Sequence, residues 1–184
     1  KIARIGEKIS VKIEGSSKGS GVLIGREGQR YFVLTAGHVV KDDKTHENVE
    51  ITTYDGSNHL WESMNTEKLE TVDLAIITFK SDKFYQTANL GKIKDILIGN
   101  DIYVSGFPIE TSTIPERLIR ITKGEVLGNT SLQIPDGYQL HHDAPTLVGM
   151  SGGGVLNTKG ELIGIHGRTE RKDSYFDFYG KDKS

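Results

Sequence analysis

A serine at position 151 stands between glycines in residues 147–156 (LVGMSGGGVL). An attacking hydroxyl must be presented on a tight turn whose backbone N–H groups converge on the carbonyl oxygen under attack, and glycines allow both the backbone angles and the close approach. A glycine-rich turn with an incidental serine, or a phosphate-binding loop, would also be glycine-rich. A phosphate loop requires a lysine and a following helix, and this stretch offers neither. Ser151 is therefore the candidate nucleophile.

Two further polar side chains stand at the ends of apolar runs. Residues 31–40 (YFVLTAGHVV) indicate a strand that breaks at Ala-Gly and delivers His38, which could equally be a hydrogen-bonded structural residue. Residues 72–79 (VDLAIITF) place Asp73 directly before an apolar strand, where a turn aspartate is the alternative interpretation. Burying a carboxylate is costly unless it is paired. Neither stretch alone indicates catalysis.

The elements that must position these residues look like short strands. The chain has 22 glycines against four prolines, and its apolar runs are short and bounded by turn residues. Only the segment after His38 and residues 66–69 look able to form a helical turn. A polar stretch with Gly91 and Gly99 separates two strand-rich halves, so we expect an all-β chain with domains at 1–90 and 91–184. The expected strands are 10–13, 21–24, 31–34, 49–54, 74–79, 102–105, 118–121, 125–127, 138–141, 154–156 and 162–166.

Taken together, the three stretches resemble the chymotrypsin superfamily, whose chain order is His, Asp, Ser and whose motifs are T-A-x-H, D-[LI]-A and G-x-S-G-[GS]. The resemblance extends from about Gly19 through Gly167 and is closer to the bacterial branches, including the glutamyl endopeptidases, than to disulfide-bonded animal enzymes. It implies two packed antiparallel β-barrels with the active site in the cleft between them. The first barrel would carry the His and Asp; the second would carry the Ser, the oxyanion hole and the specificity pocket.

The resemblance also implies a role for each site residue. His38 would take the proton from Ser151 and return it to the leaving amine, while Asp73 fixes the imidazole tautomer and stabilises the imidazolium. The N–H groups of Gly149 and Ser151 would form the oxyanion hole. Many animal members place an Asp just before the nucleophile to receive a newly cut N-terminal amine, but this chain has Met150 there. Activation by that ion pair is therefore not expected.

Substrate choice in this family depends on residues just before the nucleophile and on the strand after it. Pro145 stands where trypsin-like specificity would need an acid, so cleavage after Lys or Arg is disfavoured. Thr146 and His166, next to Gly167, match the hydroxyl and the histidine with which glutamyl endopeptidases grip an acidic side chain. A preference for Glu or Asp at P1 follows. The alternative is that His166 is a strand residue with a local hydrogen bond and Thr146 merely shapes the loop.

Composition narrows the partners of such an enzyme. The net charge is −2 with 23 basic and 25 acidic residues interspersed, so the expected substrate is a polypeptide and not a nucleic acid. The chain has no cysteine, and neighbouring His141 and His142 would point to opposite faces of a strand, so we expect no metal and no cofactor. We expect no membrane insertion. A soluble location is expected, secreted or periplasmic if an export signal was removed, and the sequence assigns no oligomeric state.

Three other hypotheses about the function stay open. An HtrA-type protease shares the triad and usually carries a PDZ domain, for which no residues are left here. A catalytically silent pseudoprotease would keep the fold as a peptide-binding or protein-binding module, although such proteins commonly lose a triad residue or an oxyanion glycine. A purely structural β-barrel would make the three motifs coincidences. The charged tail, residues 170–184, lacks the closing strand and helix usual in the family, so it is expected to be trimmed or to close the barrel irregularly.

Overall fold

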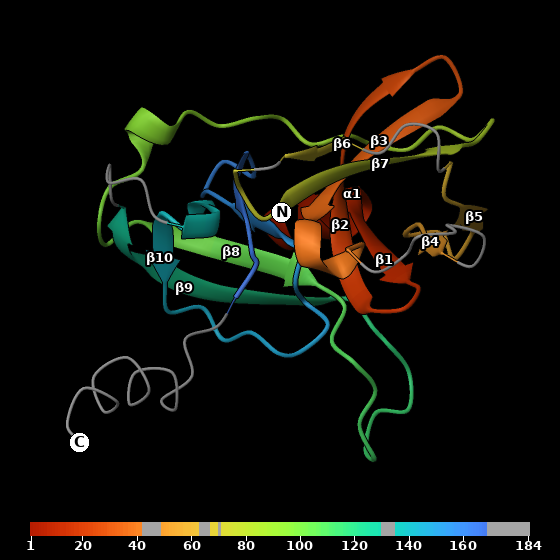
Figure 1. The fold of residues 1–184 in the computed structure, drawn as a ribbon. Helices are drawn as coiled ribbons and strands as arrows, with labels where there is room; N and C mark the ends of the chain where they lie inside the picture. The colour runs from red at the N-terminus through yellow and green to blue at the C-terminus, as the bar shows by residue number, and fades with distance from the viewer. Residues whose placement is uncertain (42–48, 63–66, 70, 130–134, 169–184) are drawn as a thin grey trace, which may run out of the picture.

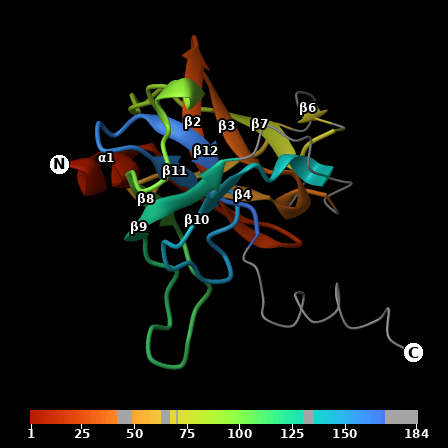
Figure 2. The same ribbon diagram turned by 90° about the vertical axis from the view of Figure 1, so that its left-hand side faces the viewer.

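Two antiparallel sheets make up most of the described chain (Figure 1). The computed structural model describes residues 1–41, 49–62, 67–69, 71–129 and 135–168. One sheet is built from strands that precede residue 81, and the other from strands that follow residue 100. The sheets curl against each other in the two views of Figures 1 and 2. The expected all-β fold of two packed barrels is confirmed.

The first sheet has the strand order β5-β4-β1-β2-β3-β7-β6 within the described residues. Every pairing in it is antiparallel. Its strands are β1 (Ser10–Glu14), β2 (Lys18–Glu27), β3 (Arg30–Ala36), β4 (Glu50–Thr52), β5 (Asn58–Leu60), β6 (Glu67–Leu69) and β7 (Leu74–Lys80).

The second sheet has the order β10-β9-β8-β11-β12 in the part of the chain that is described. The long β8–β9 pair is joined by residues 107–119, a loop that projects from the body of the molecule at the bottom of Figures 1 and 2. Its strands are β8 (Asp101–Gly106), β9 (Arg120–Asn129), β10 (Leu140–His142), β11 (Gly154–Leu156) and β12 (Leu162–Ile165). Single turns of 3₁₀ helix, η1 (Gly37–Val39), η3 (Ile93–Asp95) and η4 (Pro135–Gly137), interrupt the connections.

Alternating apolar residues fill the first barrel. Tyr31 and Val33 of β3 and Ile77 and Phe79 of β7 are fully buried, because every second side chain of a strand points to the same face. Tyr31 lies opposite Phe79 in the register, and the two rings stack with centroids 5.3 Å apart. This core fixes the β3–β7 pair, and the ends of that pair carry the first two site residues.

The N-terminal segment contradicts the expectation that no stable helix would form. Residues Ile2–Ile9 form α1, whose isoleucines pack on the second sheet although the strand that follows belongs to the first. Gly6 lies so close to Ile121 that an added methyl group would come within 3.2 Å of its side chain. An eight-residue helix is unstable alone, so this packing stabilises it. No helix in the described residues is long and apolar enough to cross a membrane.

Other differences from the sequence prediction are local. Glu67–Leu69 is the strand β6 and not a helical turn, because its backbone pairs with β7. The expected strands 118–121 and 125–127 are one strand, β9, which starts at Arg120. The strand β5 was not predicted. Of the helical turn expected after His38, the described residues show only η1 (Gly37–Val39), because residues 42–48 lie outside them. The tail 169–184 also lies outside the described residues. The domain limits 1–90 and 91–184 stay a prediction.

Candidate active site

The end of the β3–β7 pair brings His38 and Asp73 together. Ala36 is the last residue of β3 and lies opposite Leu74, the first residue of β7, so the residues just beyond them are neighbours. The Asp73 carboxylate accepts the backbone N–H of His38 at 2.8 Å and lies 2.6 Å from the imidazole Nδ1. A methyl group on Gly37 would come within 3.0 Å of that carboxylate. The two contacts fix both the position and the rotation of the imidazole.

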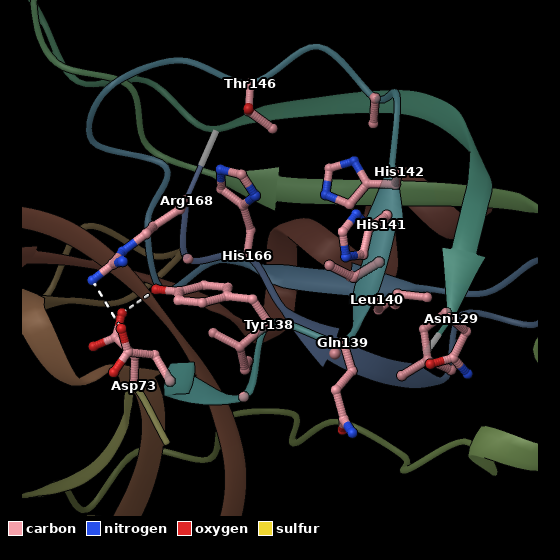
Figure 3. A pocket seen from close by; sticks show the side chains of 18 of the residues that line it. Asp73, Asn129, Tyr138, Gln139, Leu140, His141, His142, Thr146, His166 and Arg168 are labelled. Atoms are coloured by element: carbon pink, nitrogen blue, oxygen red, sulfur yellow. Dashed lines mark hydrogen bonds and ion pairs between the residues drawn. The ribbon is translucent and has the colours of Figure 1, made fainter. Parts of the chain in front are cut away.

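Tyr138 provides a third donor to the same carboxylate. Its hydroxyl donates to Asp73 Oδ2, and Figure 3 shows the ring reaching across the pocket with its hydroxyl directed at Asp73. Burial alone would raise the pKa of Asp73, but the hydrogen bonds from Tyr138 and His38 outweigh it and hold the pKa below its ordinary value. Burial and the hydrogen bond to Asp73 raise the pKa of Tyr138. Asp73 is therefore charged and Tyr138 is neutral at pH 7.

Two neighbouring residues pack on the Tyr138 ring. Gly167 leaves room for it, since a methyl group there would come within 2.3 Å of the ring. The guanidinium of Arg168 lies 5.1 Å from the ring centroid and pairs with Asp136 at 3.2 Å. The carbonyl of Asp136 accepts the N–H of Asp73 at 2.9 Å. The sequence prediction missed Tyr138 because no residue pattern marks a hydroxyl supplied by a distant connection.

The glycines around Ser151 are needed for close packing. Gly149 and Gly152 have φ of 95° and 88°, which favour glycine, and the N–H of Met150 donates to the carbonyl of Leu147 at 3.0 Å to close the turn. A methyl group on Gly152 would lie 1.9 Å from the Ser20 carbonyl. The loop is therefore pressed against strand β2 of the other barrel.

The Ser151 hydroxyl donates to the carbonyl of Gly167 at 3.0 Å. Among the described residues it makes no hydrogen bond with His38. His38 and Asp73 are thus paired, while the Ser151 hydroxyl is held by the carbonyl of Gly167, two residues beyond the end of β12. Rotation about the Ser151 Cα–Cβ bond is what would move its oxygen away from Gly167.

In the loop around Ser151, the backbone N–H groups of Gly149 and Ser151 have no acceptor among the described residues, and neither do those of the exposed residues Leu147 and Val148. The Val148 carbonyl accepts the N–H of Ile109 at 2.9 Å, so the peptide plane between Val148 and Gly149 is fixed. Because a trans peptide directs its C=O and N–H to opposite sides, the Gly149 N–H points away from Ile109. Gly149 is buried, and a buried donor without a partner is a feature expected of an anion-binding site.

A pocket of about 950 Å³ adjoins these residues. Asp73, Tyr138 and Arg168 line one end of it, and Thr146, His142 and His166 line the other (Figure 3). Gly167, whose carbonyl holds Ser151, also lines it. The residues proposed for specificity from the sequence, Thr146, His166 and Gly167, are therefore brought to one pocket beside Ser151.

Two of the histidines that line the pocket, His142 and His166, lie against each other. The ring centroids of His142 and His166 are 5.5 Å apart, and only 6% of His166 is exposed. Burial, with a small contribution from His142 and His38, lowers the pKa of His166 to about 4, and burial lowers the pKa of His142 as well. Both rings are neutral at pH 7. The Nδ1 atom of His142 is buried and has no hydrogen-bond partner among the residues that the structure describes.

His141 is exposed and also lines the pocket, because the register of β10 shifts between His141 and His142. The sequence prediction did not assign His142 to the pocket. The described residues hold no group of three or more His, Asp or Glu side chains that could bind a metal ion.

Comparison with known proteins places this fold and site in a class. Residues 19–165 match the family described as trypsin-like peptidase domain. The chain is 26% identical over 159 residues to the serine protease Do-like HtrA of Bacillus subtilis, covering 82% of this chain, and 29% identical over 156 residues to a serine protease HtrA-like protein of Staphylococcus aureus, covering 80%. A crystal structure of Deg5 matches the fold with a TM-score of 0.72 at 21% identity, over 91% of this chain and 83% of that one.

The fold and the matched residues define a serine endopeptidase domain. This chain belongs to the trypsin-like peptidase domain family. It spans 33% of the length of the Bacillus subtilis relative and 19% of that of the Staphylococcus aureus relative.

Replacing Tyr138 by Phe tests the third donor to Asp73. The Tyr138→Phe variant keeps the ring and its contacts with Gly167 and Arg168 but loses the hydrogen bond to Asp73, so covalent labelling of the enzyme by a fluorophosphonate should slow by about tenfold, the effect of one hydrogen bond. Tyr31→Phe is the matched control, because it removes a hydroxyl that holds the Lys83 carbonyl in the first barrel core. Equal labelling rates for the two variants would show that the Tyr138 hydroxyl has no role at Asp73.

The buried His166 should make stability depend on pH. Its pKa is about 4 in the folded chain against an ordinary 6.5, so between these values the unfolded chain binds a proton that the folded chain does not. Stability is therefore lost as pH falls from 6.5 towards 4, by about 3 kcal/mol from this group. Urea unfolding of wild type, His166→Asn and the exposed control His141→Asn at several pH values measures this. The expected result is a weaker pH dependence in His166→Asn alone; equal dependence in all three would contradict it.

Proposed function

We propose that this domain hydrolyses peptide bonds through an acyl-enzyme, with Ser151 as nucleophile, His38 as general base and Asp73 as the residue that orients His38. The observation that carries the proposal is the pair of contacts, 2.8 and 2.6 Å, from the backbone and the imidazole of His38 to Asp73. They leave Nε2 as the imidazole nitrogen that can accept a proton. The Gly167 carbonyl places the Ser151 hydroxyl at the edge of the specificity pocket.

The chemistry follows from these groups. Ser151 rotates away from Gly167, His38 Nε2 takes its proton, and the oxygen attacks the substrate carbonyl carbon. The oxyanion that forms accepts hydrogen bonds from the N–H groups of Gly149 and Ser151. His38 then gives its proton to the leaving amine, and the C–N bond breaks to leave an acyl-enzyme. Water attacks the acyl group with His38 as base again, which releases the acid and restores Ser151.

The resting hydrogen bond of Ser151 also favours a second candidate, a pseudoprotease that binds peptides without cutting them. In that role the hydroxyl would stay on the Gly167 carbonyl. The free N–H groups of Gly149 and Ser151 argue for the enzyme, because a binding module has no use for an oxyanion site. Covalent labelling separates the two.

The pocket supports a finer proposal, that an acidic side chain is preferred at P1. Thr146 and His166 provide a hydroxyl and an imidazole at one end of the pocket, and His142 stands beside them. A substrate carboxylate entering this site would be hydrogen-bonded by neutral imidazole and would in turn favour imidazolium. The likeness to glutamyl endopeptidases depends on Thr146 and His166 alone, whereas the relatives named above are HtrA proteases.

The relatives support further proposals about the protein that contains this domain. They are named serine proteases, so a polypeptide is the proposed substrate. Because the chain spans a fraction of their length, their other activities are not transferred to it. A location outside the cytoplasm is proposed from the sequence expectation only, and no oligomeric state is proposed.

Removal of the nucleophile is the first test of the function. Ser151→Ala should lower the turnover of fluorescein-labelled casein by a factor on the order of 10⁶ and abolish fluorophosphonate labelling, as in other triads. His38→Ala should also lose labelling while keeping Ser151. A purified Ser151→Ala protein that cleaves casein at the wild-type rate would sink the assignment, and intact Ser151 that never reacts would favour the pseudoprotease.

A peptide library that differs only at P1 tests the acidic preference. Wild type should cleave after Glu or Asp with a higher kcat/KM than after Lys, Arg or Leu. His166→Leu should lose that preference and keep cleavage after Leu, because the imidazole acts on the P1 carboxylate and not on the reacting bond. Thr146→Val, which removes one hydroxyl at nearly constant volume, should weaken the preference less. The proposal fails if the wild-type enzyme does not favour Glu and Asp.

A further inference from the structure

The loop that carries Ser151 must be held in one conformation. Met150 cannot contribute the ion pair that an aspartate at position 150 would make. Met150 is fully buried, and a methyl group on Gly106 would come within 3.0 Å of its backbone and side chain. Packing of this kind fixes a position but does not set the direction of a peptide plane. The oxyanion hole needs two specific peptide planes, because its donors are the N–H groups of Gly149 and Ser151.

A buried arginine lies behind this loop. Only 1% of the Arg117 side chain is exposed, although the residue belongs to the projecting connection between β8 and β9. Its Nη2 donates to three carbonyls, those of Phe107 at 2.7 Å, Gly19 at 2.8 Å and Gly149 at 3.3 Å. Its Nη1 donates to the Ile13 carbonyl at 2.9 Å and lies 3.5 Å from a Glu14 carboxylate oxygen.

These contacts join three parts of the chain at one side chain. Ile13 and Gly19 lie on β1 and β2 of the first barrel, Phe107 begins the projecting loop, and Gly149 precedes the nucleophile. A buried guanidinium is costly unless its donors are satisfied, so a site with this many carbonyls is built for it. A buried guanidinium that donates hydrogen bonds to backbone carbonyls fixes the peptide planes to which those carbonyls belong.

Ser20 holds the same carbonyl from the first barrel. Its hydroxyl donates to Gly149 O at 2.8 Å and accepts the Phe107 N–H at 2.8 Å, while its own N–H donates to the Ser151 carbonyl at 2.8 Å. Ser20 is fully buried on β2. The peptide plane after Gly149 is therefore held by two donors, Ser20 Oγ and Arg117 Nη2.

The peptide plane before Gly149 is held through the same arginine. The Ile109 N–H holds the Val148 carbonyl, and Arg117 bonds the carbonyls of Phe107 and Pro108, the two residues that precede Ile109. Arg117 thus acts on both peptide planes of Gly149, on one directly and on the other through the turn 107–109.

We propose that Arg117 and Ser20 are positioning residues that hold the Gly149 N–H in the direction an oxyanion hole requires, in place of an ion pair at position 150. This inference rests on the proposed function, in which Ser151 is the nucleophile. Neither side chain touches the substrate. Their effect is on the rate of the covalent step and not on binding in the pocket, because neither is among the residues that line the pocket.

The test is the kinetics of fluorophosphonate labelling of the full chain, which yields a binding constant KI and a covalent rate constant kinact. The phosphonyl oxygen acquires charge as the Ser151 oxygen attacks phosphorus and fluoride leaves, so it uses the same N–H groups. Arg117→Met should lower kinact by about 10²-fold, the usual effect of losing one oxyanion donor, with KI unchanged. Ser20→Ala should lower kinact by about tenfold.

Matched variants separate positioning from stability. Ser10→Ala removes another buried hydroxyl that joins the two barrels, since Ser10 Oγ bonds Ser105 Oγ at 2.9 Å, and Arg30→Met breaks an arginine pair with Glu62 in the first barrel. Both should leave kinact unchanged whatever their melting temperature. Arg117→Lys should recover part of the rate lost in Arg117→Met, since an ammonium reaches fewer of the carbonyls.

The outcomes are distinct. If Arg117→Met does not fold, Ser20→Ala, which removes a single oxygen, decides the matter. Folded Ser20→Ala and Arg117→Met proteins with the wild-type kinact would overturn the positioning role, as would losses confined to KI. If Ser151→Ala still takes the label, the proposed function itself fails. If Ser151 is labelled but neither Arg117→Met nor Ser20→Ala slows the labelling, only the positioning role of these two residues fails.

Discussion

The contact between strand β2 and the nucleophile loop is the constraint on which the site depends. The residues of the proposed triad come from different barrels, since His38 and Asp73 follow and precede strands of the first and Ser151 precedes β11 of the second. No covalent link sets their separation, because the chain contains no cysteine. Ser20 joins the two barrels at the site instead, through hydrogen bonds to the carbonyls of Gly149 and Ser151. The absence of a side chain at Gly152 allows the loop to approach the Ser20 carbonyl of β2 so closely, and Gly153 approaches the Ser105 carbonyl of β8 in the same way.

The parts of the site that lie on local patterns could be predicted from the sequence. Ser151 was marked by its glycines, and His38 and Asp73 by the strands that they adjoin. The structure brings His38 and Asp73 into contact because β3 and β7 are paired along their whole length. Most strands could also be predicted from their apolar alternation, which is why the fold class was correct.

The residues that support the site from a distance could not be predicted. Tyr138 and Arg117 lie in irregular connections, and each acts on a group more than thirty residues away in the chain. Their importance comes from burial and from the hydrogen bonds that burial makes necessary, and neither can be seen in a linear pattern. The helix α1 was missed for a related reason, since tertiary contacts with Ile121 and Leu156 stabilise a segment too short to be helical alone.

The titratable side chains at the two ends of the pocket differ in charge. Asp73 keeps its charge in a buried position because it accepts hydrogen bonds from the backbone and ring of His38 and from Tyr138. His142 and His166, at the other end of the pocket, are kept neutral by burial. A fixed negative charge thus stands beside His38, the proposed base, while the imidazoles of His142 and His166 stay uncharged at the other end.

The central claim is that Gly149 and Ser151 direct their N–H groups at one oxygen beside the nucleophile. A crystal structure of the fluorophosphonate adduct tests this claim most directly. The account predicts a covalent bond from Ser151 Oγ to phosphorus and a phosphonyl oxygen about 3 Å from both backbone nitrogens. A phosphonyl oxygen turned towards solvent, or a Gly149 peptide plane reversed from the one described, would contradict it.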